Sequence, residues 1–293
     1  MPPVLRDLLD HHLPGLVPET PDSYEPRIGD PPIPAGAIWE RCQGALPYRL
    51  FRPARPRWRA PLIVMLHGCT QNPEDFARST GMNEAADKVG AHVLWPEQTR
   101  RANASACWNW FDIAHQGRTG EAAAIAITIR EVLGRIGHFR KVHVAGLSAG
   151  GGMAAILAAR YGDLISAVGI HSGLPVGSAS CHRSAMRVMR KGGTGQVELA
   201  VPAIVFHGSE DKIVHPSNAA ALLPGTTERS VSTYGERIVR VSVRRRSGQR
   251  RASELWQIEG LGHAWSGGTA AMSHADPEGP DATAEMMRFF SSV

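Results

Sequence analysis

The pentapeptide Gly146-Leu147-Ser148-Ala149-Gly150 constrains the fold of this 293-residue chain more than any other stretch. An apolar run over 142–145 precedes it, and an alanine-rich, helix-like run over 153–159 follows it. A G-x-S-x-G pattern between a strand and a helix predicts a sharp elbow with the serine at its tip. The glycines lack Cβ atoms, so the strand and helix backbones can approach closely there. Ser148 is therefore the predicted nucleophile, and the following helix N-terminus favours negative charge beside it.

Apolar runs and helical patterns alternate along the rest of the chain. Predicted strands cover 61–66, 91–95, 142–147, 164–171 and 201–206, and predicted helices cover 73–89, 121–136, 181–191, 215–223 and 280–290. Strands that are apolar on both faces are typical of a parallel sheet covered on both sides. The pattern predicts an α/β fold, a three-layer sandwich with a mostly parallel central sheet. An edge strand pair within 37–52 and a hairpin over 238–259 are expected to extend the sheet.

Composition divides the chain into two parts. Residues 1–36 hold nine of the 21 prolines and predict a surface arm with one short helix over 4–12, while 37–293 form a single catalytic domain. The chain has neither an apolar run of membrane-spanning length nor the apolar segment of a signal peptide. We therefore expect a cytoplasmic protein, or a secreted one if a leader is missing or another export route is used. The four cysteines contain no C-x-x-C pair, which argues against a zinc site.

A serine nucleophile needs a base, and the base needs an orienting acid. In α/β-hydrolases they follow the serine in the order acid, then histidine. Asp211, just after the strand over 201–206, is the predicted acid, with Glu210 as the local alternative. His263 lies in a glycine-rich loop past the next strand and is the predicted base. His171 also ends a strand, but it precedes any plausible acid, so it has the wrong order.

The oxyanion of an acyl-transfer intermediate needs two backbone N–H donors. One is predicted at Ala149, directly after the nucleophile, and the other at Cys69, in the loop after the first central strand. Gln71 in the same loop, Trp110 and Trp265 are candidate substrate-binding residues; tryptophan is equally ordinary in a core. A last group of residues is basic and brackets the 238–259 hairpin turn: Arg240, Arg244, Arg245, Arg246, Arg250 and Arg251. With few aromatics nearby, this group is expected to be a solvated hairpin tip and not a nucleic-acid site.

Several motifs spread over residues 40–292 together resemble the poly(3-hydroxybutyrate) depolymerase family of esterases. They are Leu66-His67-Gly68-Cys69-Thr70-Gln71, Cys107-Trp108-Asn109-Trp110-Phe111, Gly146-Leu147-Ser148-Ala149-Gly150-Gly151, His171-Ser172-Gly173-Leu174-Pro175, Gly262-His263-Ala264-Trp265-Ser266-Gly267-Gly268, and Asp276-Pro277 with Gly279-Pro280-Asp281-Ala282. The resemblance implies an α/β-hydrolase domain that acts on short-chain carboxylic esters without a metal or an organic cofactor. It carries over the triad of Ser148, Asp211 and His263 and the oxyanion amides of Cys69 and Ala149.

The resemblance also bears on Cys69 and Cys107, because both flank active-site loops in motifs that recur together in the family. They are expected to lie close together, either as a disulfide that ties the two loops or as two free buried thiols.

The predicted function is that of a serine esterase that cleaves short-chain hydroxyalkanoate esters or oligomers through an acyl-enzyme. Secreted polymer-degrading members of the family carry a leader, a linker and a polymer-binding domain. This sequence shows none of the three, so soluble esters or oligomers are the expected substrates. The alternatives are a feruloyl or acetyl-xylan esterase and, outside enzymes, a basic binding protein. The expected partner is a small ester or oligoester, with no nucleic acid and no membrane; the sequence does not give the oligomeric state.

Overall fold

The computed structural model describes residues 29–137, 141–245 and 252–293. Within them, one ten-stranded sheet has the order β1-β2-β4-β3-β5-β6-β7-β10-β9-β8, and β11 and β12 form a separate pair. The strands are β1 (Ile38–Cys42), β2 (Tyr48–Arg52), β3 (Leu62–Leu66), β4 (His92–Pro96), β5 (Val142–Leu147), β6 (Ala167–His171), β7 (Ala203–Gly208), β8 (Thr227–Tyr234), β9 (Arg237–Arg244), β10 (Ser253–Ile258), β11 (Trp265–Ser266) and β12 (Ala275–Asp276). The helices are α1 (Pro73–Thr80), α2 (Met82–Val89), α3 (Gly120–Ile136), α4 (Ala149–Arg160), α5 (His182–Lys191), α6 (Ser217–Leu222) and α7 (Ala282–Ser291), with a short 3₁₀ turn, η2 (Ile113–His115).

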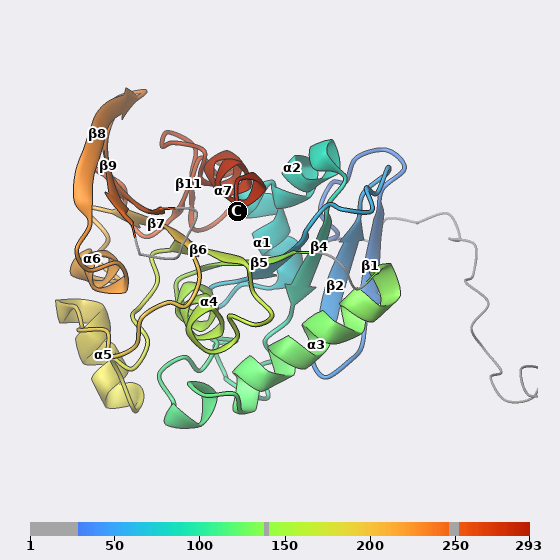
Figure 1. The fold of residues 1–293 in the computed structure, drawn as a ribbon, viewed down its shortest axis with the longest axis horizontal. Coiled ribbons are helices and arrows are strands. Elements are labelled where there is room, and N and C mark those ends of the chain that lie inside the picture. The colour runs from blue at the N-terminus through green and yellow to red at the C-terminus, as the bar shows by residue number, and fades with distance from the viewer. Residues whose placement is uncertain (1–28, 138–140, 246–251) are drawn as a thin grey trace, which may run out of the picture.

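The six central strands run parallel, and the outer strands on both sides run antiparallel. Alternate side chains of the central strands enter two separate cores. One core packs against α3, α4, α5 and α6, and the other packs against α1, α2 and α7. Figure 1 shows these helix layers on the two sides of the twisted sheet. The predicted three-layer α/β fold with a mostly parallel sheet is therefore confirmed.

Two details differ from the sequence-based expectation. The single helix predicted over 73–89 is two helices, because Gly81 between them adopts a left-handed conformation (φ 61°) that ends α1. Its predicted start is confirmed: Asn72 caps α1 by accepting a hydrogen bond from the Asp75 N–H, and Pro73 is the first helical residue. The expected hairpin, formed by β9 and β10, also pairs with a strand that the sequence did not predict. β8 pairs with β9, although its largely exposed residues carry little hydrophobic periodicity.

Some predictions lie wholly or partly outside the described residues. They are the helix over 4–12, most of the proline-rich arm, the turn at Ser247–Gly248, and Arg246, Arg250 and Arg251 of the basic group. Within the described part, Arg240 pairs with Glu259 (2.8 Å) and Arg244 pairs with Glu198 (2.6 Å). The division of the chain at residue 36 stays a prediction. Within the residues that the structure describes, no helix is both long and apolar enough to cross a membrane.

Candidate active site

The elbow predicted at Ser148 is present between β5 and α4. Ser148 has φ 57° and ψ −119°, a conformation that a residue with a side chain rarely adopts. Its N–H donates to the carbonyl of His171 at the end of β6 (2.9 Å), and its carbonyl accepts from Gly152 in the first turn of α4 (2.9 Å). Hydrogen bonds to β6 and to α4 thus hold the strained backbone of Ser148, as expected for strain at a functional site. Parallel neighbours flank β5 on both sides, so Ser148, directly after β5, lies at the carboxyl edge of the sheet.

The glycines of the pentapeptide are required by close backbone contacts. A Cβ on Gly150 would lie 2.0 Å from the carbonyl oxygen of Leu66 in β3, and one on Gly146 would lie 2.4 Å from the backbone of Gly150. Neither neighbour is a movable side-chain end. The close approach of strand and helix backbones that the glycines predicted is therefore present. The backbone of α4 packs directly against the backbones of β3 and β5.

Asp211 and His263 meet at the same edge of the sheet, although 52 residues separate them in the chain. Asp211 follows β7, His263 follows β10, and β7 and β10 are adjacent parallel strands. With the carboxyl group ionised, the Nδ1–H of His263 donates to Asp211 Oδ2 at 2.7 Å. The alternative acid, Glu210, is exposed, and its N–H donates to the Leu261 carbonyl (3.0 Å), which joins the acid loop to the histidine loop.

The Asp211 carboxylate is held from several directions. Its Oδ1 accepts hydrogen bonds from the N–H groups of Ile213 (3.0 Å) and Val214 (2.8 Å). Burial alone would raise the pKa of Asp211, but hydrogen bonds from His207 and His263 outweigh it and hold the pKa well below its usual range. Asp211 therefore stays ionised and fixes His263 with Nδ1 protonated, which leaves Nε2 as the basic nitrogen.

His171, the alternative base, has a structural role. It is fully buried, its Nε2 accepts from the Ser266 N–H (3.1 Å), and its Nδ1 lies 3.3 Å from the Ser172 hydroxyl. Burial lowers the pKa of His171 to about 3, so the ring is neutral and both nitrogens are engaged. Because His171 also accepts the Ser148 N–H through its carbonyl, it connects the elbow with the segment that follows His263.

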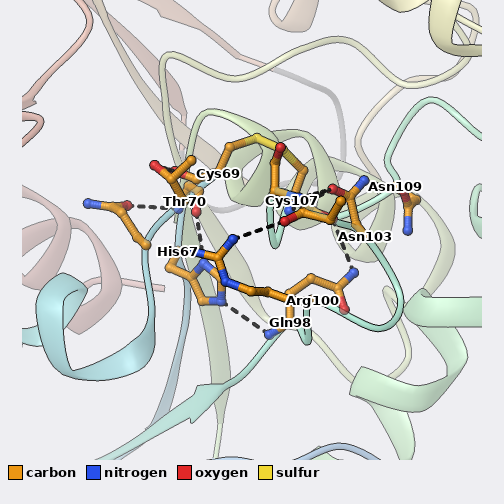
Figure 2. Close-up of a disulfide and its surroundings, with 12 residues drawn as sticks. His67, Cys69, Thr70, Gln98, Arg100, Asn103, Cys107 and Asn109 are labelled. Carbon is orange, nitrogen blue, oxygen red and sulfur yellow. Dashed lines mark hydrogen bonds between the residues drawn. A yellow bond between two sulfur atoms is a disulfide. The ribbon is translucent and has the colours of Figure 1, made fainter.

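The loop predicted to supply the second oxyanion donor is joined covalently to the long 97–119 connection. Cys69 and Cys107 form a disulfide, with Cα atoms 4.2 Å apart, which confirms the closeness expected from the family resemblance. Beside it, the Thr70 N–H donates to the Ser105 carbonyl (2.7 Å), and Figure 2 shows the two loops side by side around the bridge. Thr70 and Ala106, each next to one of the bridged cysteines, have φ of 65° and 50°. The loop conformation is thus imposed by its cross-links.

Hydrogen bonds from buried side chains support the same loop. His67 accepts the Gln98 N–H at Nε2 (3.1 Å), and its Nδ1–H donates to the Gly68 carbonyl (2.8 Å), as Figure 2 shows. Gln71 is buried and accepts the Gly68 N–H through Oε1 (2.9 Å). Gln71 therefore shapes the loop in this structure, and its predicted contact with substrate stays a prediction. As the first residue of α4, Ala149 has an N–H without a partner inside that helix.

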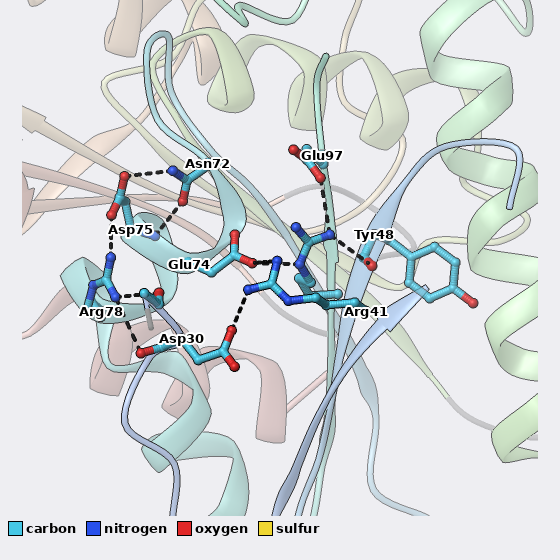
Figure 3. A network of polar contacts seen from close by, with 10 residues as sticks. Asp30, Arg41, Tyr48, Asn72, Glu74, Asp75, Arg78 and Glu97 are labelled. Carbon is cyan, nitrogen blue, oxygen red and sulfur yellow. Dashed lines mark hydrogen bonds and ion pairs between the residues drawn. The ribbon is translucent and has the colours of Figure 1, made fainter. Parts of the chain in front are cut away.

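An ion-pair network holds the first turn of α1, directly after this loop. Glu74 pairs with Arg49 (2.6 Å) and with Arg41 (2.8 Å), Arg49 also pairs with Glu97, and Arg41 also pairs with Asp30. Figure 3 shows Glu74 of α1 together with Arg41 of β1 and Glu97, which follows β4. The negative charge of Glu74 also suits the helix N-terminus. The network fixes the position of α1, and with it the end of the predicted oxyanion loop.

The two candidate tryptophans, Trp110 and Trp265, are buried in this structure. Trp265 is fully buried, donates its indole N–H to the Thr283 hydroxyl (3.0 Å) and packs against Phe76 and His171. Trp110 is 5% exposed and contacts the backbone of α4 at Gly152. Large aromatic side chains gain most by complete burial, and both residues satisfy that preference in the core. Trp265 has no accessible surface in this structure and Trp110 almost none, and their predicted contact with substrate stays a prediction.

Two histidines near the site did not emerge from the sequence. His207 Nε2 lies 2.8 Å from the Val214 carbonyl and 3.4 Å from Asp211 Oδ2. The sequence feature that marks His207 is the His-Gly pair at the end of β7, which repeats the His67-Gly68 pair directly after β3. His274 lies beside His263, in a segment that no motif marked.

The described geometry can be compared with known proteins. The family described as "Esterase PHB depolymerase" matches residues 46–253. Among curated relatives, a "Poly(3-hydroxyalkanoate) depolymerase C" from Paucimonas lemoignei is 31% identical over 178 residues, which covers 54% of this chain and 42% of that protein. A "Feruloyl esterase B" from Thermothelomyces thermophilus is 26% identical over 186 residues, which covers 56% of this chain and 63% of that one. The matched regions thus span less than two thirds of these relatives' own lengths.

Solved structures confirm the fold. An acetyl xylan esterase from Aspergillus awamori superposes with a TM-score of 0.66 at 15% identity, over 87% of this chain and 99% of that one. At that identity the likeness concerns the α/β-hydrolase architecture alone. The family match spans most of the chain, from β2 through the elbow and the loop that carries Asp211 to the start of β10. The chain therefore belongs to the PHB depolymerase family of esterases.

Proposed function

We propose that the protein is a serine esterase that hydrolyses short-chain hydroxyalkanoate esters or oligomers. The observation that carries the proposal is the Asp211–His263 hydrogen bond at the sheet edge to which the strained Ser148 elbow also belongs. This arrangement provides a nucleophile, a base and an orienting acid after the carboxyl ends of β5, β10 and β7, with β6 between β5 and β7. Relatives whose names describe polyester depolymerases supply the substrate class.

The reaction follows from the roles of these groups. Ser148 Oγ attacks the ester carbonyl carbon while His263 Nε2 takes its proton, and the N–H groups of Cys69 and Ala149 donate to the oxyanion. The C–O bond to the alcohol then breaks, and His263 returns the proton to the leaving oxygen. Water attacks the acyl-serine with the same base, which frees Ser148 and releases the carboxylic acid. Asp211 remains ionised throughout and holds the imidazole.

Ser148→Ala tests the proposal. We expect hydrolysis of p-nitrophenyl acetate and of soluble 3-hydroxybutyrate oligomers to fall by roughly 10⁴-fold or more, because triad members act as a unit. The circular dichroism spectrum and the melting temperature should match those of the unchanged protein, since alanine removes only a hydroxyl. A folded variant with near-normal turnover of both substrates would refute the assignment of Ser148.

A second candidate function is that of a feruloyl or acetyl-xylan esterase, because relatives with those names match about half of this chain. The two candidates differ in the acyl group. Rates on methyl ferulate, acetylated xylan and 3-hydroxybutyrate trimer separate them at equal enzyme concentration, and the largest kcat/KM identifies the acyl group. Absence of hydrolysis of all three, and of p-nitrophenyl acetate, would favour the non-enzymatic alternative, a basic binding protein.

The disulfide bears on localisation. Disulfides persist in oxidising compartments and are rare in the reducing cytosol. The Cys69–Cys107 bridge therefore favours an exported protein over the cytoplasmic one expected from the sequence, and we propose export. Cell fractionation followed by detection of the protein in the medium or periplasm tests this, and retention of the bulk in the cytosol with reduced Cys69 and Cys107 would contradict it.

A further inference from the structure

A second histidine ring lies against the candidate base. The rings of His263 and His274 are perpendicular, with centroids 6.3 Å apart. The His263 side chain is only 9% exposed, whereas His274 is exposed. Within the described residues, the His274 ring makes no hydrogen bond with the protein. A solvent-facing imidazole with free hydrogen-bonding atoms therefore stands next to the group that transfers the proton.

Backbone pairing determines where His274 lies. β11 and β12 pair in parallel, with Trp265 opposite Ala275, so the residues just before each strand leave the pair at the same end. His263 precedes β11 by two residues, and His274 immediately precedes β12. The Trp265 N–H donates to the His274 carbonyl (2.7 Å), which joins the two segments directly.

Further contacts anchor β12. Arg237 pairs with Asp276 at 2.5 Å, and the Gly267 N–H donates to the Asp276 carbonyl (2.8 Å). His274 itself has φ 60°, in the left-handed region that few non-glycine residues occupy. Such conformations persist where surrounding structure fixes them, and they cluster at functional sites. The fold thus holds His274 beside His263.

The proposed mechanism indicates what would touch this ring. His263 returns its proton to the leaving oxygen, so the leaving alcohol must lie against His263 and next to His274. In a hydroxyalkanoate oligomer, the leaving alcohol carries a further ester or carboxylate group a few bonds away. That group offers a carbonyl oxygen to a donor, whereas p-nitrophenol has no such oxygen close to the cleaved bond.

We propose that His274 is a specificity-determining residue that donates a hydrogen bond to the carbonyl or carboxylate oxygen in the leaving part of a hydroxyalkanoate oligomer. The inference rests on the proposed esterase function and adds a residue that recognises its substrate. Partial burial and then the neighbouring His263 lower the pKa of His274, so the ring is neutral at pH 7 and has one N–H to donate.

The test compares two substrates across three variants. His274→Phe keeps an aromatic ring against His263 without a donor, and His274→Asn restores an N–H donor in a residue that tolerates the left-handed backbone. For 3-hydroxybutyrate trimer, kcat/KM of His274→Phe should fall by about 10- to 100-fold, the range for one lost hydrogen bond to substrate. For p-nitrophenyl acetate it should stay within about twofold. His274→Asn should recover part of the trimer activity, and His182→Phe, on α5, is the matched control expected to change neither rate.

Each other outcome overturns the inference in a recognisable way. An equal fall on both substrates would mean that His274 only positions His263. Unchanged rates on both substrates would mean that the ring touches no substrate. If the unaltered protein cleaves p-nitrophenyl acetate but not the trimer, the oligomer substrate of the proposed function fails and the role of His274 fails with it. If the unaltered protein cleaves the trimer and His274→Phe does so equally well, only the role of His274 fails.

Discussion

At the scale of single residues, Asp211 illustrates how much the proposed role of an orienting acid depends on the surroundings of the side chain. Two backbone N–H groups and two imidazoles converge on a side chain that has no exposed surface. Glu210, the adjacent carboxylate with the same chemistry, points into solvent and accepts none of these bonds. The proposed choice of Asp211 over Glu210 as the acid therefore depends on position in the loop and not on residue type.

This contrast gives a paired prediction. Asp211→Asn should lower kcat on p-nitrophenyl acetate by about 10⁴-fold, because the amide presents a donor to His263 and favours the wrong tautomer. Glu210→Gln should leave kcat within about twofold, as expected for an exposed side chain outside the site. A large loss in Glu210→Gln together with a small loss in Asp211→Asn would show that the acid is misassigned.

At the scale of elements, the proposed oxyanion loop is covalently attached to the 97–119 connection. The disulfide joins segments 38 residues apart, and residues on both sides of it have left-handed backbones that need external support. If the Cys69 N–H stabilises the transition state, loosening the loop should lower kcat more than it raises KM.

Reduction of the bridge tests this dependence. We expect dithiothreitol, or the double variant Cys69→Ser with Cys107→Ser, to lower kcat by at least about tenfold, since one oxyanion donor contributes about 10²–10³-fold. The matched control is Cys42→Ser with Cys181→Ser, which removes the described free thiols and should keep both activity and sensitivity to the reductant. Unchanged kcat after verified reduction would show that the loop is held by its hydrogen bonds alone.

The network around Glu74 supports the same loop from the other side. Glu74→Gln leaves the buried Arg49 guanidinium short of one carboxylate, so we expect the free energy of unfolding to fall by about 1–3 kcal/mol, the usual cost of an unsatisfied buried polar group. Asp163→Asn breaks the exposed Arg118–Asp163 pair and should cost no more than about 1 kcal/mol. Urea unfolding of both variants measures the difference, and equal losses would contradict a special role for the network.

At the scale of the whole molecule, buried neutral histidines link stability to pH. Burial lowers the pKa of His67 to about 4 and the pKa of both His143 and His171 to about 3. In the unfolded chain a histidine titrates near ~6.5. Below that pH the unfolded state binds more protons than the folded state, so these groups lower stability as the pH falls toward about 4, and their contribution is fully present above pH ~6.5.

The melting temperature should therefore fall steadily from pH 7 to pH 4. His143→Phe is the sharpest probe, because His143 stacks on Phe290 and its Nδ1 has no hydrogen-bond partner in the described structure. In this variant the free energy of unfolding should depend less steeply on pH, by the uptake of one proton. His182→Gln, at an exposed position, should keep the slope of the unaltered protein. An unchanged slope in His143→Phe would show that His143 does not titrate in this range.

The sequence by itself determined the elements and their chemistry. Continuous apolar runs specify strands buried on both faces, and the G-x-S-x-G pattern specifies an elbow, because both depend on residues close together in the chain. The same local reasoning placed Asp211 and His263 at strand ends. It could not find β8, whose exposed residues have no core-facing stripe and which depends on pairing with β9.

Only the tertiary structure decided which of these residues meet. Strand order brings β7 beside β10 and so pairs Asp211 with His263 across 52 residues, and loop packing joins Cys69 to Cys107. It also decided that Trp265 is buried in the core and that His274 lies beside His263, although Trp265 belongs to a sequence motif and His274 to none. The physical reason is that burial and contact across the sheet edge arise from long-range packing, which local periodicity does not encode.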